Sequence, residues 1–375
     1  MQTRNETNLW EHTLPIALES HRLQTEIDVD VAIIGGGFTG VSAALRLVER
    51  GASVALVEAL RIGAGGSGKN VGLVNSGLWL EPNEIIKKLG EKNGERLNAF
   101  LAASPSLVFD NIRKYGIDCE AEERGTLHCA PSTRGMRELE RRLDQYHALG
   151  HEADLLNAQD TADKVGSSVF KGSILQKNAG TIQPLSYVSG LAKAARDSGA
   201  KIFESSPATS VVRNKDLWQV DTPEGKVRAS ALLLATNAYH SNLAISGAPN
   251  FIQVNYFQLA TDPLPLKDQQ VVLPDRQGCW DTALIMSSFR RDKAGRLIIG
   301  GVGALGHSLS NVHYEWAKHK LKQLFPNLGN VEIQHAWHGR IAYTGDNLPR
   351  IQSFGPNAIS VYGYNGRGIG PGTSF

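Results

Sequence analysis

Apolar residues along the chain follow two periodicities in turn, which predict buried strands and amphipathic helices. Residues 31–34 form a continuous apolar run, as expected of a strand that is buried on both faces. In the next segment the apolar residues recur at helical spacing on one face: Val41, Ala44, Leu45 and Val48. Gly51 then follows as a typical helix end, and residues 53–57 return as an apolar strand. This order predicts a strand–helix–strand unit of a parallel sheet.

Other parts of the chain continue this alternation. We expect helices over residues 83–116, 135–149, 184–198 and 313–325, and strands over residues 125–130, 199–204 and 231–236. The first of these helical segments should break near Ser104-Pro105, because proline lacks the amide hydrogen that a helix needs. The charges of the segment 135–149 should form a solvated face: Arg137, Glu138, Glu140, Arg141, Arg142 and Asp144.

The pattern changes between residues 250 and 301. Short runs with polar alternation predict an antiparallel sheet with strands at residues 252–260, 282–286 and 296–300, and the glycines of residues 301–306 predict a hairpin turn. The fold class is therefore mixed α/β, with a Rossmann-type parallel-sheet domain interleaved with an antiparallel-sheet domain. We expect the first domain at 25–90, 174–245 and 335–375, the second at 91–173 and 246–334, and an N-terminal arm at 1–24.

Composition narrows the function without naming it. With 375 residues and a net charge of +2, the chain gives no strong electrostatic case for nucleic acid or an anionic membrane as a partner. No uninterrupted apolar run approaches the ~18 residues of a membrane span. The three cysteines, Cys119, Cys129 and Cys279, are scattered without zinc-site spacing, so we expect no metal, and free thiols in a cytoplasmic protein.

The glycines between the first strand and its helix predict a dinucleotide site. Gly35 permits a tight turn, Gly37 lets the backbone approach a pyrophosphate, and Gly40 lets the helix pack closely on the strand. Glu58 ends the second strand near the expected offset, where its carboxylate can bind ribose hydroxyls and would repel the 2′-phosphate of NADP. Two other G-x-G-x-x-G matches, at residues 63–68 and 301–306, open no amphipathic helix.

A second glycine-rich segment, residues 61–77, directly follows this acid. It contains six glycines, whose exposed amides favour anion contacts. Arg61, Ser67, Lys69 and Asn70 add charged or polar donors to it. A flexible surface loop is the alternative, but a ligand that extends beyond one nucleotide would pass here.

Several ordered motifs now resemble one family. They are Leu9-Trp10, the Gly-Phe-Thr-Gly of residues 37–40, the Gly-Gly-Ser-Gly-Lys-Asn-Val-Gly of residues 65–72, and residues 235–239, 337–344 and 362–371. Together they resemble the D-amino-acid oxidase and glycine oxidase superfamily of FAD enzymes, and within it the branch of gamma-glutamylputrescine oxidases. The resemblance extends over essentially the whole chain.

The resemblance implies noncovalent FAD between the two domains and an amine or amino acid as substrate. Such enzymes remove a hydride from the carbon next to an amine nitrogen, release an imine, and usually pass the electrons to molecular oxygen as hydrogen peroxide. A dehydrogenase that uses a quinone or another carrier is the alternative. Relatives that bind FAD covalently use a cysteine or a histidine, but no cysteine follows Cys279 and residues 61–77 contain no histidine.

Candidate site residues follow from the motifs and the resemblance. Those expected to bind FAD are Gly35, Gly37, Phe38, Thr39, Gly40, Glu58, Ala59, Arg61, Ser67, Gly68, Lys69, Asn70, Gly72, Leu73, Ala208, Ala235, Thr236, Asn237, Arg340, Gly366, Arg367, Gly368, Ile369 and Gly370. Arg340, His338 and Tyr256 are the catalytic or substrate-binding candidates. Arg340 suits a substrate carboxylate, although it could instead brace the flavin, and His338 could be a proton acceptor or a structural histidine. The aromatic candidates for a pocket wall are Tyr256, Trp280, Trp337, Tyr343 and Tyr364.

Two features depart from the family pattern. Lys69 replaces an arginine and Val71 a glycine in the second glycine-rich segment. The sequence ends at Phe375, where the family continues into a helix whose N-terminus points at the flavin. We therefore keep a third reading open, in which the chain is a flavin-binding protein with impaired catalysis.

Overall fold

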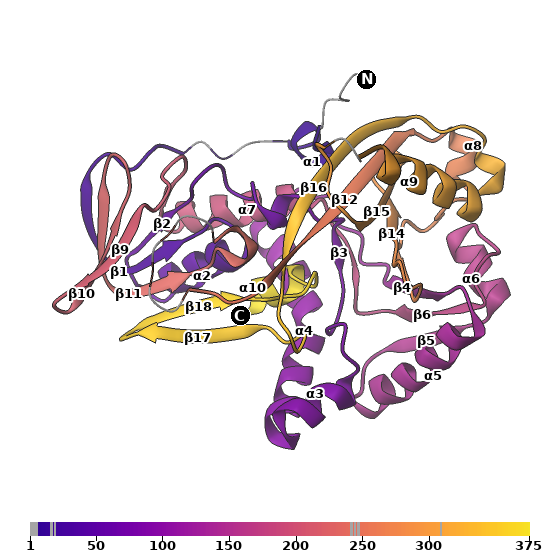
Figure 1. Ribbon diagram of the computed structural model, residues 1–375, viewed down its shortest axis with the longest axis horizontal. Helices are drawn as coiled ribbons and strands as arrows, with labels where there is room; N and C mark the ends of the chain where they lie inside the picture. Colours follow the sequence, from indigo (N-terminus) through magenta and orange to yellow (C-terminus); the bar gives the residue numbers. More distant parts are fainter. Residues whose placement is uncertain are drawn as a thin grey trace.

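The computed structural model describes residues 7–15, 18, 20–240, 243, 245, 248–307 and 310–375. Two large sheets lie side by side along the longest axis, each with its own helices (Figure 1). In the described part of the chain, no helix is both long enough and apolar enough to cross a membrane.

The first sheet contains the predicted parallel strands. Its order is β17 (Arg350–Gly355), β18 (Ala358–Tyr362), β11 (Lys226–Leu234), β1 (Glu26–Ile34), β2 (Val54–Val57) and β8 (Lys201–Phe203). In addition, β10 (Leu217–Asp221) pairs with β11, and β9 (Ser210–Asn214) pairs with β10. The neighbours from β18 to β8 are parallel, and β1 pairs with β11 on one side and β2 on the other. The unit predicted from residues 31–57 is therefore present, and it lies at the centre of its sheet.

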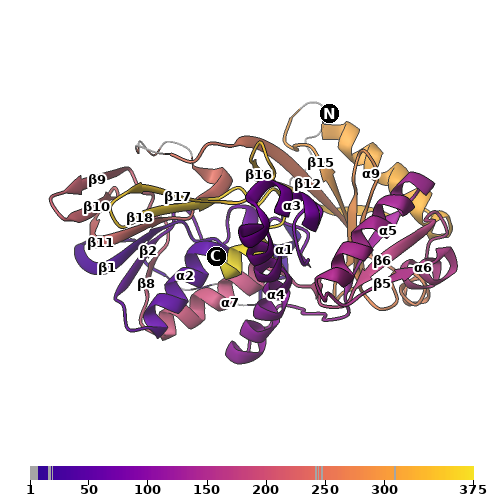
Figure 2. The same cartoon turned by 90° about the horizontal axis from the view of Figure 1, so that it is seen from below.

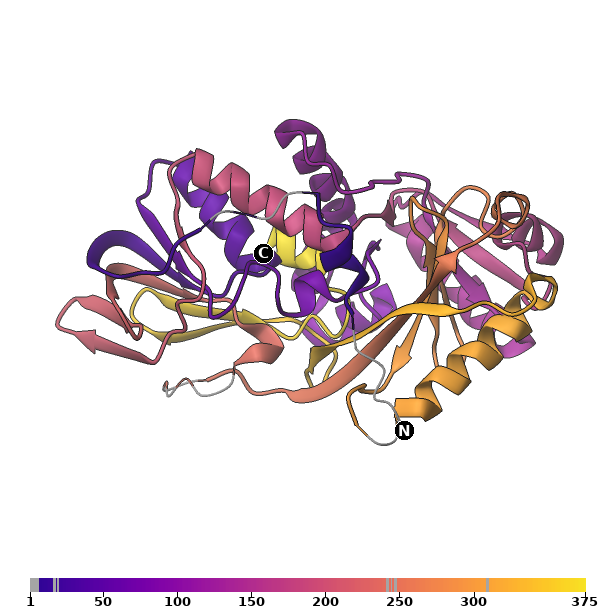
Figure 3. The same cartoon turned by 90° about the horizontal axis from the view of Figure 1, so that it is seen from above.

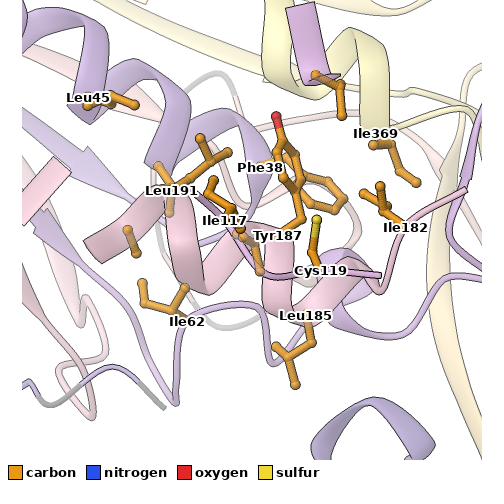
Figure 4. Packing of buried hydrophobic residues seen from close by; sticks show 14 of the residues in the cluster. Phe38, Leu45, Ile62, Ile117, Cys119, Ile182, Leu185, Tyr187, Leu191 and Ile369 are labelled. Atoms are coloured by element: carbon orange, nitrogen blue, oxygen red, sulfur yellow. The ribbon is translucent and has the colours of Figure 1, made fainter. Parts of the chain in front are cut away.

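Helices cover one face of this sheet. They are α2 (Phe38–Glu49), α7 (Pro184–Asp197) and the terminal α10 (Ile369–Ser374), which lie together in Figure 3. Their buried side chains share one core: Phe38 and Leu45 come from α2, Leu191 from α7 and Ile369 from α10 (Figure 4). This packing places the N-terminus of α2 next to the chain's last turn.

The second sheet is largely antiparallel, as predicted. Its order is β16 (Ile333–Tyr343), β12 (Ile252–Pro263), β15 (Arg296–Val302), β14 (Ser288–Arg291), β13 (Gly278–Asp281), β4 (Thr126–Ala130), β6 (Gly172–Gln176) and β5 (Ala153–Leu156), with β13 and β4 parallel. It is flanked by α5 (Thr133–Ala148), α6 (Ala158–Val165) and α9 (Ser310–Leu324) (Figure 2), and by the short helix α8 (Leu266–Gln269) (Figure 1).

Further elements join the two parts. They are α1 (Leu9–His12), α3 (Pro82–Leu89), α4 (Glu91–Tyr115), the two-stranded sheet of β3 (Leu73–Val74) and β7 (Gly180–Thr181), and the 3-10 turns η1 (Gly66–Gly68) and η2 (Asn237–Tyr239). A third 3-10 turn, η3 (Pro326–Leu328), follows α9 and packs against it. The long strands β12 and β16 run from the second sheet toward the first (Figure 1).

The helix break predicted near Ser104-Pro105 was wrong, because α4 continues through Pro105. The missing amide hydrogen of Pro105 would leave the Leu101 carbonyl without its donor. The Ser104 hydroxyl supplies that donor at 2.8 Å. The break lies instead at Gly90, whose φ of +77° separates α3 from α4.

Three smaller expectations also need correction. Residues 282–286 connect β13 to β14 rather than forming a strand, because the Asp281 carboxylate binds the amides of Ala283 and Ser287 and so fixes a turn. Residues 301–306 lead from β15 to α9 and form no hairpin, since β12 and β14 already occupy both edges of β15. Arg142 is buried, not solvated, and donates to two backbone carbonyls.

Candidate active site

The glycine turn after β1 forms a compact cradle. Gly35 has a φ of +111°, and its amide donates to Val57 at the end of β2. The Gly36 amide donates to Oε2 of Glu58 at 2.7 Å. A Cβ on Gly40 would collide with the Gly35 carbonyl, so this glycine permits the close approach of α2 that the sequence predicted. The turn therefore brings the N-terminus of α2 and the strand-end acid together.

Glu58 occupies a half-buried position at this turn. Burial raises the pKa of its carboxyl group, while hydrogen bonds from the Leu60 and Gly36 amides oppose that shift. Each oxygen accepts one backbone amide, Oε2 from Gly36 and Oε1 from Leu60 at 3.0 Å. Because a carboxylate oxygen can accept more than one hydrogen bond, both oxygens remain able to bind ribose hydroxyls.

Side chains hold the second glycine-rich segment in one conformation by donating hydrogen bonds to its backbone carbonyls. The Asn70 side chain donates to the carbonyls of Gly66 and Ser67. The Asn8 side chain donates to the carbonyl of Gly68, and Trp10 Nε1 donates to the backbone carbonyl of Asn70 at 2.8 Å. These donors come partly from α1, so this part of the expected N-terminal arm packs against the cofactor segment. The segment is thus a fixed loop in this structure, not the flexible surface loop that was its alternative.

Trp337 completes this set of donors. Its Nε1 donates to the Lys69 carbonyl at 3.0 Å, and its ring meets that of Trp10 edge-on at 5.7 Å. Trp337 is buried in the core and does not line the cavity, in contrast to its expected role as a pocket wall. Its position among the donors shows that it supports the glycine loop instead.

A cavity of about 790 Å³ lies between the two domains, and its volume is within the range of small-molecule sites. It is lined by these predicted residues: Gly35, Gly37, Phe38, Thr39, Glu58, Ala59, Ser67, Lys69, Asn70, Leu73, Ala208, Ala235, Thr236, Asn237, Tyr256, Arg340, Gly366, Arg367, Gly368 and Ile369. They come from the β1–α2 turn, the glycine loop, the ends of β11 and β18, and strands β12 and β16. Segments far apart in the sequence therefore meet at one cavity.

Six predicted residues are not among those that line this cavity: Gly40, Arg61, Gly68, Gly72, His338 and Gly370. The glycines among them allow close packing, as where a Cβ on Gly72 would collide with the Ile182 carbonyl. Arg61 is exposed and pairs with Glu11 at 3.5 Å. His338 lies opposite Phe257 in the β12–β16 ladder, so its proposed role as proton acceptor gains no support from this placement.

The cavity also has walls that sequence reasoning did not assign. Trp79 and Asn75 follow the glycine loop, and Gln258 and Ser288 come from the second sheet. Alternation along β12 could have indicated Gln258, because it shares a sheet face with Tyr256. Trp79 lies in a connection without regular structure, and no sequence signal pointed to it. Trp280, Tyr343 and Tyr364, named as aromatic candidates, do line the cavity.

Tyr256 is the most firmly held polar group on the second-sheet side. Its hydroxyl lies 3.1 Å from Ser288 Oγ and donates to the Gly300 carbonyl at 3.1 Å. Burial raises the pKa of Tyr256 above its ordinary value. The phenol is therefore neutral near pH 7 and can position a ligand, but it cannot act as an anionic base.

Among the described residues, no cluster of three or more histidine, cysteine or acidic side chains could hold a metal ion. The cavity extends from a dinucleotide turn to a wall of aromatic and amide side chains. This arrangement fits an extended dinucleotide whose reactive group lies between the domains. The fold and the site thus define a dinucleotide-cofactor enzyme of Rossmann type with an antiparallel second domain.

Comparisons with known proteins specify the class. A family model described as "FAD dependent oxidoreductase" (DAO) matches residues 30–374, so the chain belongs to this family and is an FAD-dependent oxidoreductase. It is 30% identical to the probable oxidoreductase OrdL of Haemophilus influenzae over 92% of this chain and 80% of that protein. It is 28% identical to the gamma-glutamylputrescine oxidoreductase of Escherichia coli over 92% of this chain and 82% of that protein.

A solved structure agrees with this assignment at the level of the fold. The glycine oxidase of Geobacillus kaustophilus superposes with a TM-score of 0.74 at 19% identity, covering 92% of each chain. The mixed α/β architecture and the FAD cofactor, both expected from the sequence, are confirmed.

Proposed function

We propose that this enzyme oxidises a C–N bond of an amine or amino acid to the imine, with molecular oxygen as the electron acceptor. One observation carries the proposal: a single cavity connects the dinucleotide turn at Glu58 with Tyr256 and Trp280 of the second sheet. A substrate at these second-sheet residues would lie at the far end of the same cavity. The names of the similar gamma-glutamylputrescine oxidoreductase and glycine oxidase support an amine substrate.

Bound FAD would accept the hydride from the carbon next to nitrogen and pass two electrons and two protons to oxygen, giving hydrogen peroxide. The amine loses a proton to solvent, and water hydrolyses the C=N bond to a carbonyl compound and an amine or ammonia. The protein orients the substrate. Because the Tyr256 hydroxyl donates to Gly300, its oxygen keeps a lone pair that can accept a substrate N–H.

Aromatic side chains keep water from the second-sheet end of the cavity. Trp280 is buried and Tyr343 half-buried, and both line the cavity from strands of the second sheet. A site with little water strengthens the electrostatic interactions that orient a charged or polar substrate. We also propose a cytoplasmic location, which is supported by three buried cysteines that all carry free thiols.

The test is an anaerobic screen of amines and amino acids against the FAD-loaded protein. We expect at least one compound to bleach the visible absorbance of the flavin, and air to restore it with one peroxide per substrate oxidised. If no compound on a broad panel bleaches a fully flavinated protein, the proposed reaction is wrong and the non-catalytic reading is favoured. Bleaching with reoxidation by a quinone but not by oxygen would keep the C–N oxidation and replace the acceptor.

A further inference from the structure

The guanidinium group of Arg367 lies between two tryptophan rings in the cavity wall. Its central carbon is 4.3 Å from the ring centroid of Trp79 and 4.2 Å from that of Trp280. The two rings meet edge-on, with centroids 5.1 Å apart. Arg367 is only 6% exposed, and all three residues line the cavity. Cation–π contact on both rings therefore fixes the position of a buried positive charge.

This buried charge has no anionic partner among the residues that the structure describes. Arg367 Nε and Nη2 are buried and form no hydrogen bond there. Burying a charge without a partner is costly, and native proteins pair buried charges almost without exception. Nε and Nη2 form one edge of the guanidinium, with two parallel N–H groups at the spacing that a carboxylate accepts.

The surroundings of Arg367 add donors and positive charge rather than an acid. Trp280 Nε1 is buried without a partner in the described structure, and the ring of His128 stacks on Trp280. Arg142, also buried, lies close enough to lower the pKa of both His128 and Arg367. Burial is the largest cause in each case, and it brings the pKa of Arg367 to about 10. The guanidinium is therefore still charged at neutral pH.

Arg340, the arginine that the sequence favoured for a substrate carboxylate, occupies a different setting. It is exposed, and its guanidinium lies 5.2 Å from the ring of Tyr239. Solvent screens an exposed charge and weakens its hold on an anion. Arg367 combines burial, two unused parallel donors and a fixed orientation, so it is the stronger anion-binding group of the cavity.

We propose that Arg367, held between Trp79 and Trp280, binds the carboxylate of a substrate in a bidentate geometry. The proposal rests on the proposed amine oxidation, and it restricts the substrate class to amines that carry a carboxylate. The planar tryptophan walls additionally favour a flat or extended carbon chain next to that carboxylate. The pyrimidine edge of the flavin is the competing partner for the same donors.

The test measures binding to the oxidised, FAD-loaded enzyme, so it does not depend on turnover. Benzoate is the anionic probe and benzamide its neutral counterpart, and both are titrated by the change in the visible flavin spectrum and by calorimetry. Truncating one partner of a buried charge pair weakens binding by about 30-fold or more. We expect Arg367→Met to lose benzoate affinity by this factor and to bind benzamide as the wild type does. Arg367→Lys should lose less benzoate affinity, because lysine keeps the positive charge but not the two parallel N–H donors.

Arg213→Met is the matched control, because Arg213 also lies over a tryptophan ring, that of Trp218, but does not line the cavity. It should change benzoate affinity by less than about threefold, as for a screened charge outside the site. The proposal is overturned if the wild type does not distinguish benzoate from benzamide, or if Arg340→Met loses benzoate while Arg367→Met does not. It is also overturned if Arg367→Met binds benzoate normally but shifts the flavin reduction potential, which would assign Arg367 to the flavin. Normal benzoate binding without amine turnover would contradict the proposed function alone.

Discussion

The hydrogen bond from Trp10 to the Asn70 carbonyl should help to hold the glycine loop in the conformation that binds the cofactor, and removing it tests this role. Trp10 is fully buried, and its Nε1 donates to the Asn70 carbonyl at 2.8 Å. Trp10→Phe removes this donor while keeping an aromatic ring. An acceptor left without its partner costs about 1–3 kcal/mol, and the smaller ring adds about 1 kcal/mol for the space it leaves. We expect the free energy of unfolding to fall by about 2–4 kcal/mol.

The same substitution should weaken FAD binding, because the loop must then be ordered when the cofactor binds. A cost of about 1.4 kcal/mol corresponds to a tenfold rise in the dissociation constant. Urea unfolding of the apoprotein gives the first quantity and quenching of FAD fluorescence gives the second. Trp316→Phe is the control, since Trp316 packs on Phe257 in the second domain, at 5.7 Å between ring centroids. Equal FAD affinities in the two variants would refute the proposed ordering role.

Three further substitutions test separate parts of the structure. Glu58→Gln should raise the FAD dissociation constant by about tenfold. The glutamine side chain has one acceptor oxygen, which cannot serve the backbone N–H groups of Gly36 and Leu60 and the ribose hydroxyls together. An unchanged dissociation constant in equilibrium dialysis would contradict this. Ser104→Ala should lower the thermal midpoint through a loss of about 1 kcal/mol, because Leu101 loses its only side-chain donor next to Pro105, and calorimetry measures it. Hydrogen bonds from Lys114 and Tyr115, together with Arg46, lower the pKa of Glu49 to about 2 in the folded state. The ionised carboxylate therefore stabilises the fold at any pH above the pKa of Glu49 in the unfolded chain, and this stabilisation is lost as the pH falls through about 2. Glu49→Gln should therefore cost about 1 kcal/mol at pH 7 and progressively less in urea titrations between pH 4.5 and 2.

Local sequence was enough to predict the cofactor turn. The apolar run at residues 31–34, the three glycines and Glu58 lie within one strand–helix–strand unit, and each has a backbone or hydrogen-bonding role that depends on near neighbours. The helices α2 and α7 were predicted for the same reason, since their buried faces repeat at helical spacing. The break expected at Pro105 failed because a neighbouring hydroxyl replaced the missing donor, and composition alone does not show such an exchange.

The ligand-binding end of the cavity depended on contacts between distant segments. Trp79, Trp280 and Arg367 come from three distant parts of the sequence, yet the guanidinium group of Arg367 contacts both tryptophan rings. The sequence placed both Arg340 and Arg367 at the cofactor site and favoured Arg340 for a substrate carboxylate. Our proposal favours Arg367 because burial and missing partners are properties of the folded surroundings. The sequence by itself determined the dinucleotide turn, because each residue of that turn acts through near neighbours, and its family resemblance implied FAD. Only the folded chain revealed the buried, unpaired charge that we propose for a substrate carboxylate, because burial and partners depend on distant segments.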